Sequence, residues 1–326
     1  DIGIKDVLLA GGKIEGIYDN IELKDDLLKI NIIDGNKKLM FPGFIDSHVH
    51  IIGGGGEGGY HTRTPEIQLS SLIESGITSV VGCIGTDDIP KDLRDFIDTR
   101  LQKEYREGLQ LKEEGISAYA YTGSYEVPVK TATESIKSDL MLIDEIIGVG
   151  EIALSDHRSS QPSFDGFVNL VAQSRVGGLL SNKAGIVNVH LGEGMRRLKY
   201  IFDLIEQTEI PAEQLLPTHI NRNSDLFEMG LEYVKKGGYI DLTTSCDLEH
   251  MENGELRAGE GLGVFLEKGM EIEHMTFSSD GNGSMPRFDK NGNLAGLGIC
   301  SVSSLYREVK FAIKEFNVPI DKAISV

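Results

Sequence analysis

The chain has 326 residues, 40% of them hydrophobic, and a formal net charge of −19. This length suits a single α/β barrel with a small appendage. The negative charge argues against a nucleic acid as partner, because binding to phosphates requires a basic surface. No run approaches the roughly 20 apolar residues of a membrane helix, and no signal-peptide pattern opens the chain, so we expect no membrane partner.

The three cysteines, Cys83, Cys246 and Cys300, are far apart in the sequence and form no C-x-x-C motif. An odd number of isolated cysteines is typical of reduced thiols in the cytoplasm. We therefore expect a cytoplasmic protein with neither a disulfide framework nor a zinc ribbon.

The first 40 residues differ in pattern from the rest of the chain. Residues 6–20 predict a β-hairpin with its turn at Gly11 and Gly12, and residues 26–40 predict a second pair of strands. This segment is too short to form a stable β-sandwich alone. We interpret residues 1–40 as the N-terminal part of a small β domain.

Residues 41–326 are expected to form the larger domain. Its pattern is one of strands that are apolar on both faces, separated by helices, which is typical of a parallel sheet; eight such units indicate a (β/α)8 TIM barrel. The expected strands lie in 38–46, 78–85, 116–123, 149–156, 185–192, 214–220, 238–245 and 274–280. The expected helices lie in 64–76, 91–114, 133–147, 195–207, 225–238 and 303–316.

Side chains that are able to bind metals come at the C-terminal ends of these strands, where barrel enzymes place their active sites. Alternate residues of a strand face the same way, so His48 and His50 share one side. Six side chains would then converge on one mouth of the barrel: His48, His50, Glu151, His190, His219 and Asp280. Imidazole and carboxylate groups suit zinc or a similar divalent metal. Six ligands suit a pair of cations, and the two oxygens of Glu151 suit a bridge between them.

Each of these residues also has a simpler explanation when it is taken singly. An isolated H-x-H pair or a histidine in an apolar strand is more often structural, and Asp280 suits the start of a turn. Their joint position at consistent strand ends favours the metal site. Two other motifs are rejected: the glycine run 53–56 lacks the G-K-[ST] ending of a phosphate-binding loop, and 289–293 lacks the glycine and glutamate of a calcium loop and predicts a turn.

The motif "PGFIDSHVH", the strand-end residues His190 and His219, and "SSDGNGS" resemble the amidohydrolase superfamily of metal-dependent hydrolases. Longer stretches resemble the isoaspartyl dipeptidases, or β-aspartyl peptidases: "HVHIIGGGGEGG", "RTPE", "TGSYEVP", "SDHRS", "SRVGGLL" and "LPTHINRN". The resemblance runs from about Asp6 to the end of the chain. It implies a TIM barrel with a small β-sandwich and a metallopeptidase that hydrolyses β-aspartyl dipeptides with two divalent metals, Zn²⁺ above all. It also implies a homo-oligomer.

The resemblance implies roles for individual residues. His48 and His50 would bind one metal, and His190 and His219 the other. Asp280 would be both a metal ligand and the catalytic acid and base, and Tyr125 would polarise the scissile carbonyl. Glu57 would receive the α-ammonium group of the substrate. The residues that match positions holding the substrate carboxylates and backbone are Gly55, Thr86, Arg158, Arg222 and Ser284.

Two features depart from the family pattern. Known members bridge their metals with a carboxylated lysine of the fourth strand. Counting backward from "ALSDHR" puts Glu151 at that position, whereas counting forward from Tyr125 puts Gly150 there, so a one-residue insertion lies between the two. We take Glu151 as the bridge, because a carboxylate is also a two-oxygen anion. The second departure is that the chain stops soon after its last helix, and we expect the C-terminal part of the β-sandwich to be missing.

The expected reaction is hydrolysis of a β-aspartyl dipeptide by a hydroxide that bridges two metals. Two arginines and one carboxylate match the two carboxylates and one ammonium of such a substrate. Two alternatives stay open. One is another binuclear amidohydrolase, such as a cyclic amidase or an N-acyl-amino-acid deacylase, and the second is a non-catalytic relative that has lost its metals.

Overall fold

The computed structural model describes residues 2–22, 30–56, 59–86, 115–246, 248, 251, 254–288 and 294–326. The chain divides into two compact units, residues 1–42 and residues 43–326. The helix expected at 91–114 lies outside the described residues. None of the helices in the described ranges is long and apolar enough to cross a membrane.

The first unit contains the expected hairpin. Strands β1 (Asp6–Ala10) and β2 (Lys13–Tyr18) pair in antiparallel fashion, and Gly11 and Gly12 between them have φ values of 56° and 75°. Glycine adopts these left-handed conformations without the steric cost that a Cβ brings. The second strand pair is not formed by residues 30–40, and 26–29 lie outside the described residues. No described strand pairs with this apolar segment, and its side chains remain largely in solvent.

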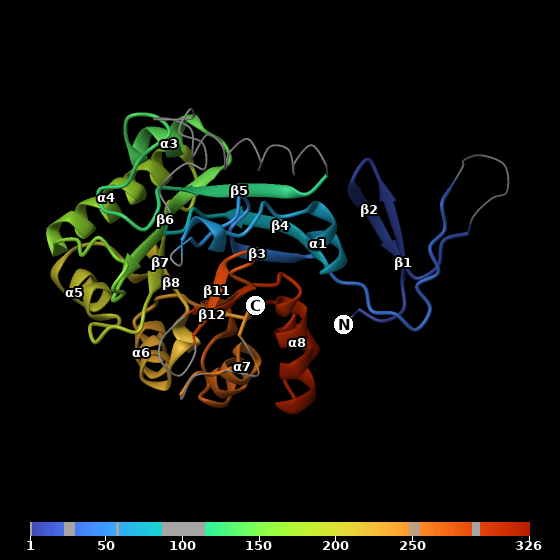
Figure 1. Ribbon diagram of the computed structural model, residues 1–326. Coiled ribbons are helices and arrows are strands. Elements are labelled where there is room, and N and C mark those ends of the chain that lie inside the picture. The colour runs from blue at the N-terminus through green and yellow to red at the C-terminus, as the bar shows by residue number, and fades with distance from the viewer. Residues whose placement is uncertain are drawn as a thin grey trace. The chain divides into compact units, whose positions relative to one another are not determined.

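The second unit contains a parallel sheet in the chain order expected for a barrel. The six neighbouring strands are β3 (Phe44–Val49), β4 (Ile77–Gly82), β5 (Ser117–Thr122), β6 (Ile146–Leu154), β7 (Ile186–Leu191) and β8 (Leu215–Thr218). Strands β9 (Ile240–Thr243) and β10 (Met275–Ser278) form a separate parallel pair. β9 lies beside β8 and β10 beside β3, and Val49 makes a parallel bridge to Gly281 just after β10. The arrangement is TIM-barrel-like (Figure 1).

Helices cover the outside of these strands (Figure 1). The described α-helices are α1 (Leu69–Glu74), α3 (Ile136–Leu142), α4 (Phe164–Ser181), α5 (Lys199–Gln207), α6 (Ser224–Lys235), α7 (Ala258–Glu267), α8 (Ser304–Glu315) and α9 (Ile320–Ala323). Short 3-10 helices are η1 (Tyr60–Thr62), η3 (Ala212–Gln214), η4 (Ile220–Arg222) and η5 (Ile272–His274). An antiparallel hairpin that the sequence did not predict, β11 (Ser284–Phe288) and β12 (Leu294–Ile299), flanks the expected turn at 289–293, which lies outside the described residues.

Polar side chains cap the first turns of helices α4 and α6. Ser163 accepts a hydrogen bond from the amide of Gly166 at the start of α4, and Asn223 accepts one from Leu226 at the start of α6. Ser and Asn side chains satisfy amides that have no partner in the first helical turn. Asn182, the residue after α4, has the left-handed conformation common at helix ends.

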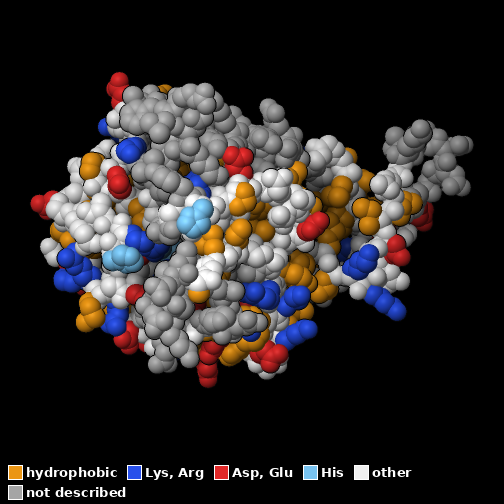
Figure 2. Space-filling model, viewed as in Figure 1, with side chains coloured by type: hydrophobic (Ala, Val, Ile, Leu, Met, Phe, Trp, Pro, Cys, Tyr) orange, Lys and Arg blue, Asp and Glu red, His pale blue; other side chains and the backbone are white. Residues whose placement is uncertain are grey.

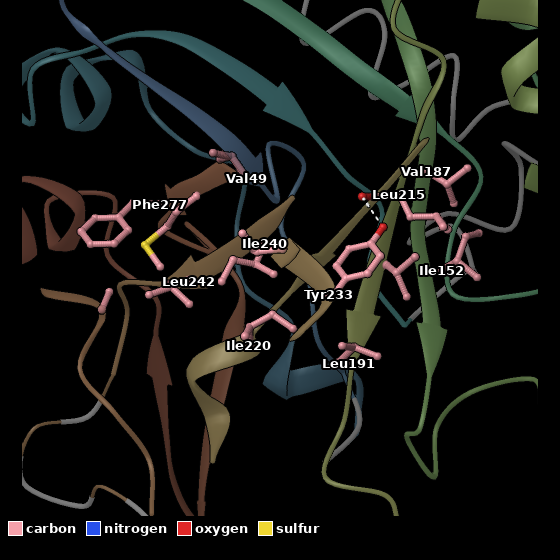
Figure 3. Packing of buried hydrophobic residues seen from close by; sticks show 14 of the residues in the cluster. Val49, Ile152, Val187, Leu191, Leu215, Ile220, Tyr233, Ile240, Leu242 and Phe277 are labelled. Carbon is pink, nitrogen blue, oxygen red and sulfur yellow. Dashed lines mark hydrogen bonds between the residues drawn. The ribbon is translucent and has the colours of Figure 1, made fainter. Parts of the chain in front are cut away.

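Apolar side chains from the strands and helices meet in one core. Figure 3 shows Val49 of the sheet on the side of Ile240, Leu242 and Phe277 of the β9 and β10 pair, and Ile152, Val187 and Leu215 of the sheet around Tyr233. The buried hydroxyl of Tyr233 in α6 donates to the carbonyl oxygen of Leu215, at 3.3 Å. The exterior differs: Figure 2 shows acidic and basic side chains interspersed over the displayed face.

Helices α7 and α8 are joined by a buried carboxylate. Glu308 in α8 is fully buried, and its oxygens accept hydrogen bonds from both Arg257, at 2.8 and 3.2 Å, and Arg307, at 3.2 Å. The backbone amide of Gly259 in α7 also donates to Glu308, at 3.3 Å. Loss of this carboxylate leaves the partly buried guanidinium of Arg257 without its partner.

We expect Glu308→Ala to lower the free energy of unfolding by about 3 kcal/mol, because removal of one partner leaves a buried charge uncompensated. The midpoint of urea unfolding measures this change. Glu315→Ala is the matched control, since Glu315 is exposed on the same helix, and its effect is expected to stay within about 0.5 kcal/mol. Equal midpoints for the two variants would contradict the role of Glu308.

Candidate active site

Glu151 lies at an irregularity of β6 that turns its side chain inward. In the ladder between β6 and β7, Val149 pairs with Val187 and Ile152 pairs with Val189. Three steps along β6 therefore match two along β7, which is the geometry of a β-bulge with one extra residue. The side chain of Glu151 is 1% exposed.

Four imidazoles surround the Glu151 carboxylate. Oε2 lies 3.3 Å from His48 Nε2, 3.2 Å from His190 Nδ1 and 4.0 Å from His219 Nε2, and Oε1 lies 3.5 Å from His50 Nε2. All four histidines are buried. The structure therefore brings together side chains from the ends of β3, β6, β7 and β8, as the strand-end pattern predicted.

Asp280 completes the group from the loop after β10. Its Oδ1 lies 3.0 Å from His50 Nε2 and 3.6 Å from His48 Nε2. Asp280 and His219 both have left-handed backbones, with φ values of 52° and 61°. Such conformations cost a non-glycine residue about 1 kcal/mol and are typical of functional sites. These turns direct the two side chains toward Glu151 and His50.

The donor set fits a pair of metal ions. Glu151 Oε1 and both ring nitrogens of His48 are buried and make no hydrogen bond of good geometry within the described residues. Unsatisfied buried polar atoms are rare unless a ligand or ion completes them. Donor atoms gather into two groups that share Glu151, one with His48, His50 and Cys83 and the other with His190 and His219. A carboxylate common to both groups suits a bridge between two cations.

The charges of the site are coupled. Although burial raises it, the positive charge of His48 and the hydrogen bond from His190 hold the pKa of Glu151 well below its usual range. Burial lowers the pKa values of His48 and His50, but their interactions with Cys83 and Glu151 raise both to well above the usual value. Burial and the neighbouring His190 lower the pKa of His219. In the metal-free protein an ionised Glu151 is thus balanced by charged imidazoles.

His219 is oriented by a hydroxyl group of the next strand. Its Nδ1 lies 2.5 Å from Thr243 Oγ1, at the end of β9. This contact leaves Nε2 directed at Glu151. A polar partner on one ring nitrogen fixes which nitrogen offers its lone pair to a metal.

Tyr125 lies over His190 at the mouth of the group. Its hydroxyl oxygen is 2.9 Å from His190 Nδ1, and its side chain is buried. Burial raises the pKa of Tyr125 to well above its usual value. The hydroxyl therefore stays protonated and is able to donate a hydrogen bond.

Asp156 is a functional candidate that the sequence patterns did not single out. Its Oδ2 lies 3.0 Å from His190 Nε2, and its two oxygens accept from Arg158 Nε and Nη2, at 3.0 and 2.8 Å. Partial burial raises the pKa of Asp156, but these hydrogen bonds hold it well below the usual range. Asp156 lies two residues after β6, within the "SDHRS" motif, and no sequence signal marked its contact with His190. Asp156 links a metal-ligand candidate to a substrate-binding candidate.

Arg222 is the last residue of η4 and comes three residues after His219. Its Nη1 lies 3.6 Å from Glu193 Oε1, and its buried Nε makes no hydrogen bond in the described structure. Arg222 therefore lies just beyond the C-terminal end of β8, on the same side of the site as His219. Glu57, the expected ammonium ligand, lies outside the described residues.

The remaining predicted substrate-binding residues each follow a glycine that packs on His50. A Cβ atom at Gly54, Gly85 or Gly283 would lie 3.1, 3.2 or 3.1 Å from the nearest atom of the His50 ring. The next residues are Gly55, Thr86 and Ser284. Three loops that are far apart in the sequence therefore meet around one imidazole.

Comparison with solved structures identifies a close relative. The chain is 45% identical to the β-aspartyl dipeptidase of the thermophilic, keratin-degrading Fervidobacterium islandicum AW-1, solved in complex with the dipeptide β-Asp-Leu. The TM-score is 0.87, and the match covers 99% of this chain and 80% of that one. An amidohydrolase from Mycoplasma synoviae has the same fold, with a TM-score of 0.53, 14% identity and coverage of 87% and 85%.

Curated proteins match over a shorter region. A dihydroorotase from Listeria welshimeri is 32% identical over 108 residues, which are 33% of this chain and 23% of that protein. The match therefore spans about a quarter of the length of the curated relative. No protein-family model matches the chain. The extent and identity of the match to the Fervidobacterium enzyme show that this chain belongs to the β-aspartyl dipeptidase family of the amidohydrolase superfamily.

Proposed function

We propose that this protein is a metal-dependent peptidase that hydrolyses β-aspartyl dipeptides. The observation that carries the proposal is the buried Glu151 among four histidines, in a chain that is 45% identical to a β-aspartyl dipeptidase over 80% of that enzyme's length. We also propose that the eight strands form a closed barrel and that residues 1–42 belong to a small β domain. The homo-oligomer and the cytoplasmic location stay predictions.

The proposed metal ligands fall into two sets. His48 and His50 would hold one divalent cation and His190 and His219 the other, with Glu151 shared and Asp280 as a further ligand. We propose zinc, because it accepts imidazole and carboxylate ligands together. When bound, such a pair supplies a hydroxide nucleophile at neutral pH and polarises the substrate carbonyl.

Two residues of the chain would manage protons and charge during the reaction. Asp280 Oδ1 lies 3.6 Å from His48 Nε2 and 3.0 Å from His50 Nε2, and there it would take the proton of the nucleophile and pass it to the leaving amine. The protonated Tyr125 hydroxyl would donate a hydrogen bond to the oxyanion that develops from the scissile carbonyl.

Charged side chains would select the substrate. Arg158 and Arg222 offer planar guanidinium groups to its two carboxylates, and Glu57 offers a carboxylate to its α-ammonium group. Gly55, Thr86 and Ser284 would contact its carboxylates and backbone. This charge pattern suits a short dipeptide with free ends.

A rival reaction is hydrolysis of a cyclic amide. The similarity to a dihydroorotase over 108 residues favours this reaction among those of the remaining amidohydrolases. Hydrolysis of an N-acyl amino acid is a further rival, and a non-catalytic relative would hydrolyse none of these compounds. Amidohydrolases that catalyse these other reactions need not share Arg158 and Arg222.

The first test measures turnover of β-Asp-Leu, α-Asp-Leu, dihydroorotate and an N-acyl amino acid by the zinc-loaded protein. We expect kcat/KM for β-Asp-Leu to exceed each of the others by at least about 100-fold, because the charged groups of the site would be left unpaired by the wrong substrate. A preference for α-Asp-Leu or dihydroorotate, or no turnover at all, would contradict the proposal.

The second test removes the proposed bridge. We expect Glu151→Ala and Glu151→Gln to lose bound metal and to lower kcat/KM by about 100-fold or more, because neither side chain offers an anionic pair of oxygens. Metal content by elemental analysis accompanies the kinetics. Glu206→Ala, at an exposed position of α5, is the control and should keep both. Full metal and activity in Glu151→Ala would show that the bridging role is wrong.

The third test concerns Asp156 as a positioning residue. Asp156→Asn keeps the size of the side chain but presents an amide to His190 and Arg158. We expect kcat/KM to fall by about 10- to 100-fold, with weaker metal retention during dialysis, as is typical when a polar partner of a metal ligand is lost. Asp165→Asn, an exposed position at the start of α4, is the matched control. Unchanged metal retention in Asp156→Asn would rule out positioning of His190.

A further inference from the structure

Cys83 lies beside the H-x-H pair and has no role in the proposed reaction. It follows β4, and its backbone amide donates to the carbonyl oxygen of Val49, at 3.0 Å. Val49 separates His48 from His50 and pairs with Gly82 in the ladder between β3 and β4. The main chain therefore holds Cys83 at the level of the two imidazoles.

The thiol is within reach of a metal shared with these histidines. Cys83 Sγ lies 3.9 Å from His50 Nδ1. One donor atom each of His48, His50, Cys83 and Glu151 lies within 4.8 Å of the other three. Nitrogen and sulfur ligands of a tetrahedral zinc ion lie roughly 3.5 Å apart, given the usual bond lengths. Small side-chain movements would bring these four donors around one ion.

The burial of Cys83 and of the donor atoms around it favours a metal ion as the partner of the thiol. Cys83 and His48 have no exposed surface, and Glu151 is 1% exposed. Oε1 of Glu151 and both ring nitrogens of His48 make no hydrogen bond of good geometry in the described structure. These donor atoms beside Cys83 are therefore available to a metal ion. A thiolate is a strong ligand of zinc and adds a negative charge that a divalent cation balances.

A packing role is the simpler explanation of this cysteine. Cys83 also contacts Val81 and Tyr121, and cysteine is among the most buried residue types. A second explanation is a hydrogen bond from the thiol to His50 Nδ1, while Nε2 of that ring faces Glu151 and Asp280. In both cases the sulfur atom is not bonded to a metal. An experiment that detects a metal–sulfur bond therefore distinguishes them from a ligand role.

We propose that the thiolate of Cys83 is a ligand of the metal ion held by His48 and His50, alongside Glu151. This inference rests on the metal dependence in the proposed function and adds a sulfur atom to the ligand set. The other two cysteines provide comparisons, because neither belongs to a group of possible metal ligands in the described structure.

The test uses the full chain loaded with Co²⁺ and, separately, with Zn²⁺. We expect the Co²⁺ protein to show a sulfur-to-cobalt charge-transfer band in the near ultraviolet beside its visible ligand-field bands. X-ray absorption of the Zn²⁺ protein should show a sulfur neighbour at about 2.3 Å. Cys83→Ser should lose the band and the sulfur neighbour, whereas Cys246→Ser, a buried cysteine elsewhere, should keep both.

The outcomes separate this inference from the proposed function when β-Asp-Leu turnover is measured on the same samples. Turnover without a sulfur signal overturns the role of Cys83 and keeps the function. A sulfur signal that depends on Cys83, without turnover of any β-aspartyl dipeptide, supports the ligand and overturns the function. Absence of bound metal together with absence of turnover overturns both. X-ray absorption of the unsubstituted protein decides the case even if Cys83→Ser fails to fold.

Discussion

The burial of one carboxylate, Glu151, is the constraint on which the site depends. An ionised carboxylate that is 1% exposed is strongly destabilising unless opposite charges surround it. His48 and His50 meet that need within 3.5 Å, His190 adds a polar contact at 3.2 Å, and each comes from the end of a parallel strand. The strand order brings these ends together, so the fold and the charge balance support one another.

The same constraint accounts for the bulge in β6. A regular strand would place Glu151 and Ile152 one step out of register with β7, and a shift of one residue reverses which side chains face inward. The extra residue lets Val149 and Ile152 both stay in the apolar core while Glu151 faces the histidines. Apolar packing and metal-ligand geometry are thus reconciled within a few residues.

The glycine-rich motifs serve this arrangement by making room around His50. Gly54, Gly85 and Gly283 each approach its ring so closely that a Cβ atom would lie 3.1 to 3.2 Å away. Thr64 then ties the first of these loops to the last, since its hydroxyl accepts from the amide of Gly54 and donates to the carbonyl oxygen of Asn282. The run 53–56, which superficially resembles a phosphate-binding loop, is used for close packing.

The eight parallel strands could be predicted from the sequence, because strands that are apolar on both faces are typical of a parallel sheet that is covered by helices. The hairpin of β11 and β12 escaped prediction, since "SMPRF" contains a proline and "LAGLGI" two glycines, both unfavourable in strands. The sequence also left two counts open at positions 150 and 151; in the structure the carboxylate of Glu151 faces the histidines, and its role as the bridge stays a prediction. Asp156 and Cys83 could not be singled out, because their contacts with His190 and His50 join segments that are more than 30 residues apart.

Preorganised charge favours a small, doubly charged substrate. Asp156 fixes the plane of the Arg158 guanidinium with two hydrogen bonds, and Glu193 lies 3.6 Å from Arg222. A guanidinium that is already held loses less conformational entropy when a ligand carboxylate arrives. These acidic partners also moderate the positive charge of the arginines beside the four histidines. The acidic residues at the site therefore hold the arginine side chains in place and would balance the proposed metals, and the proposed selection of a substrate with two carboxylates rests on this arrangement.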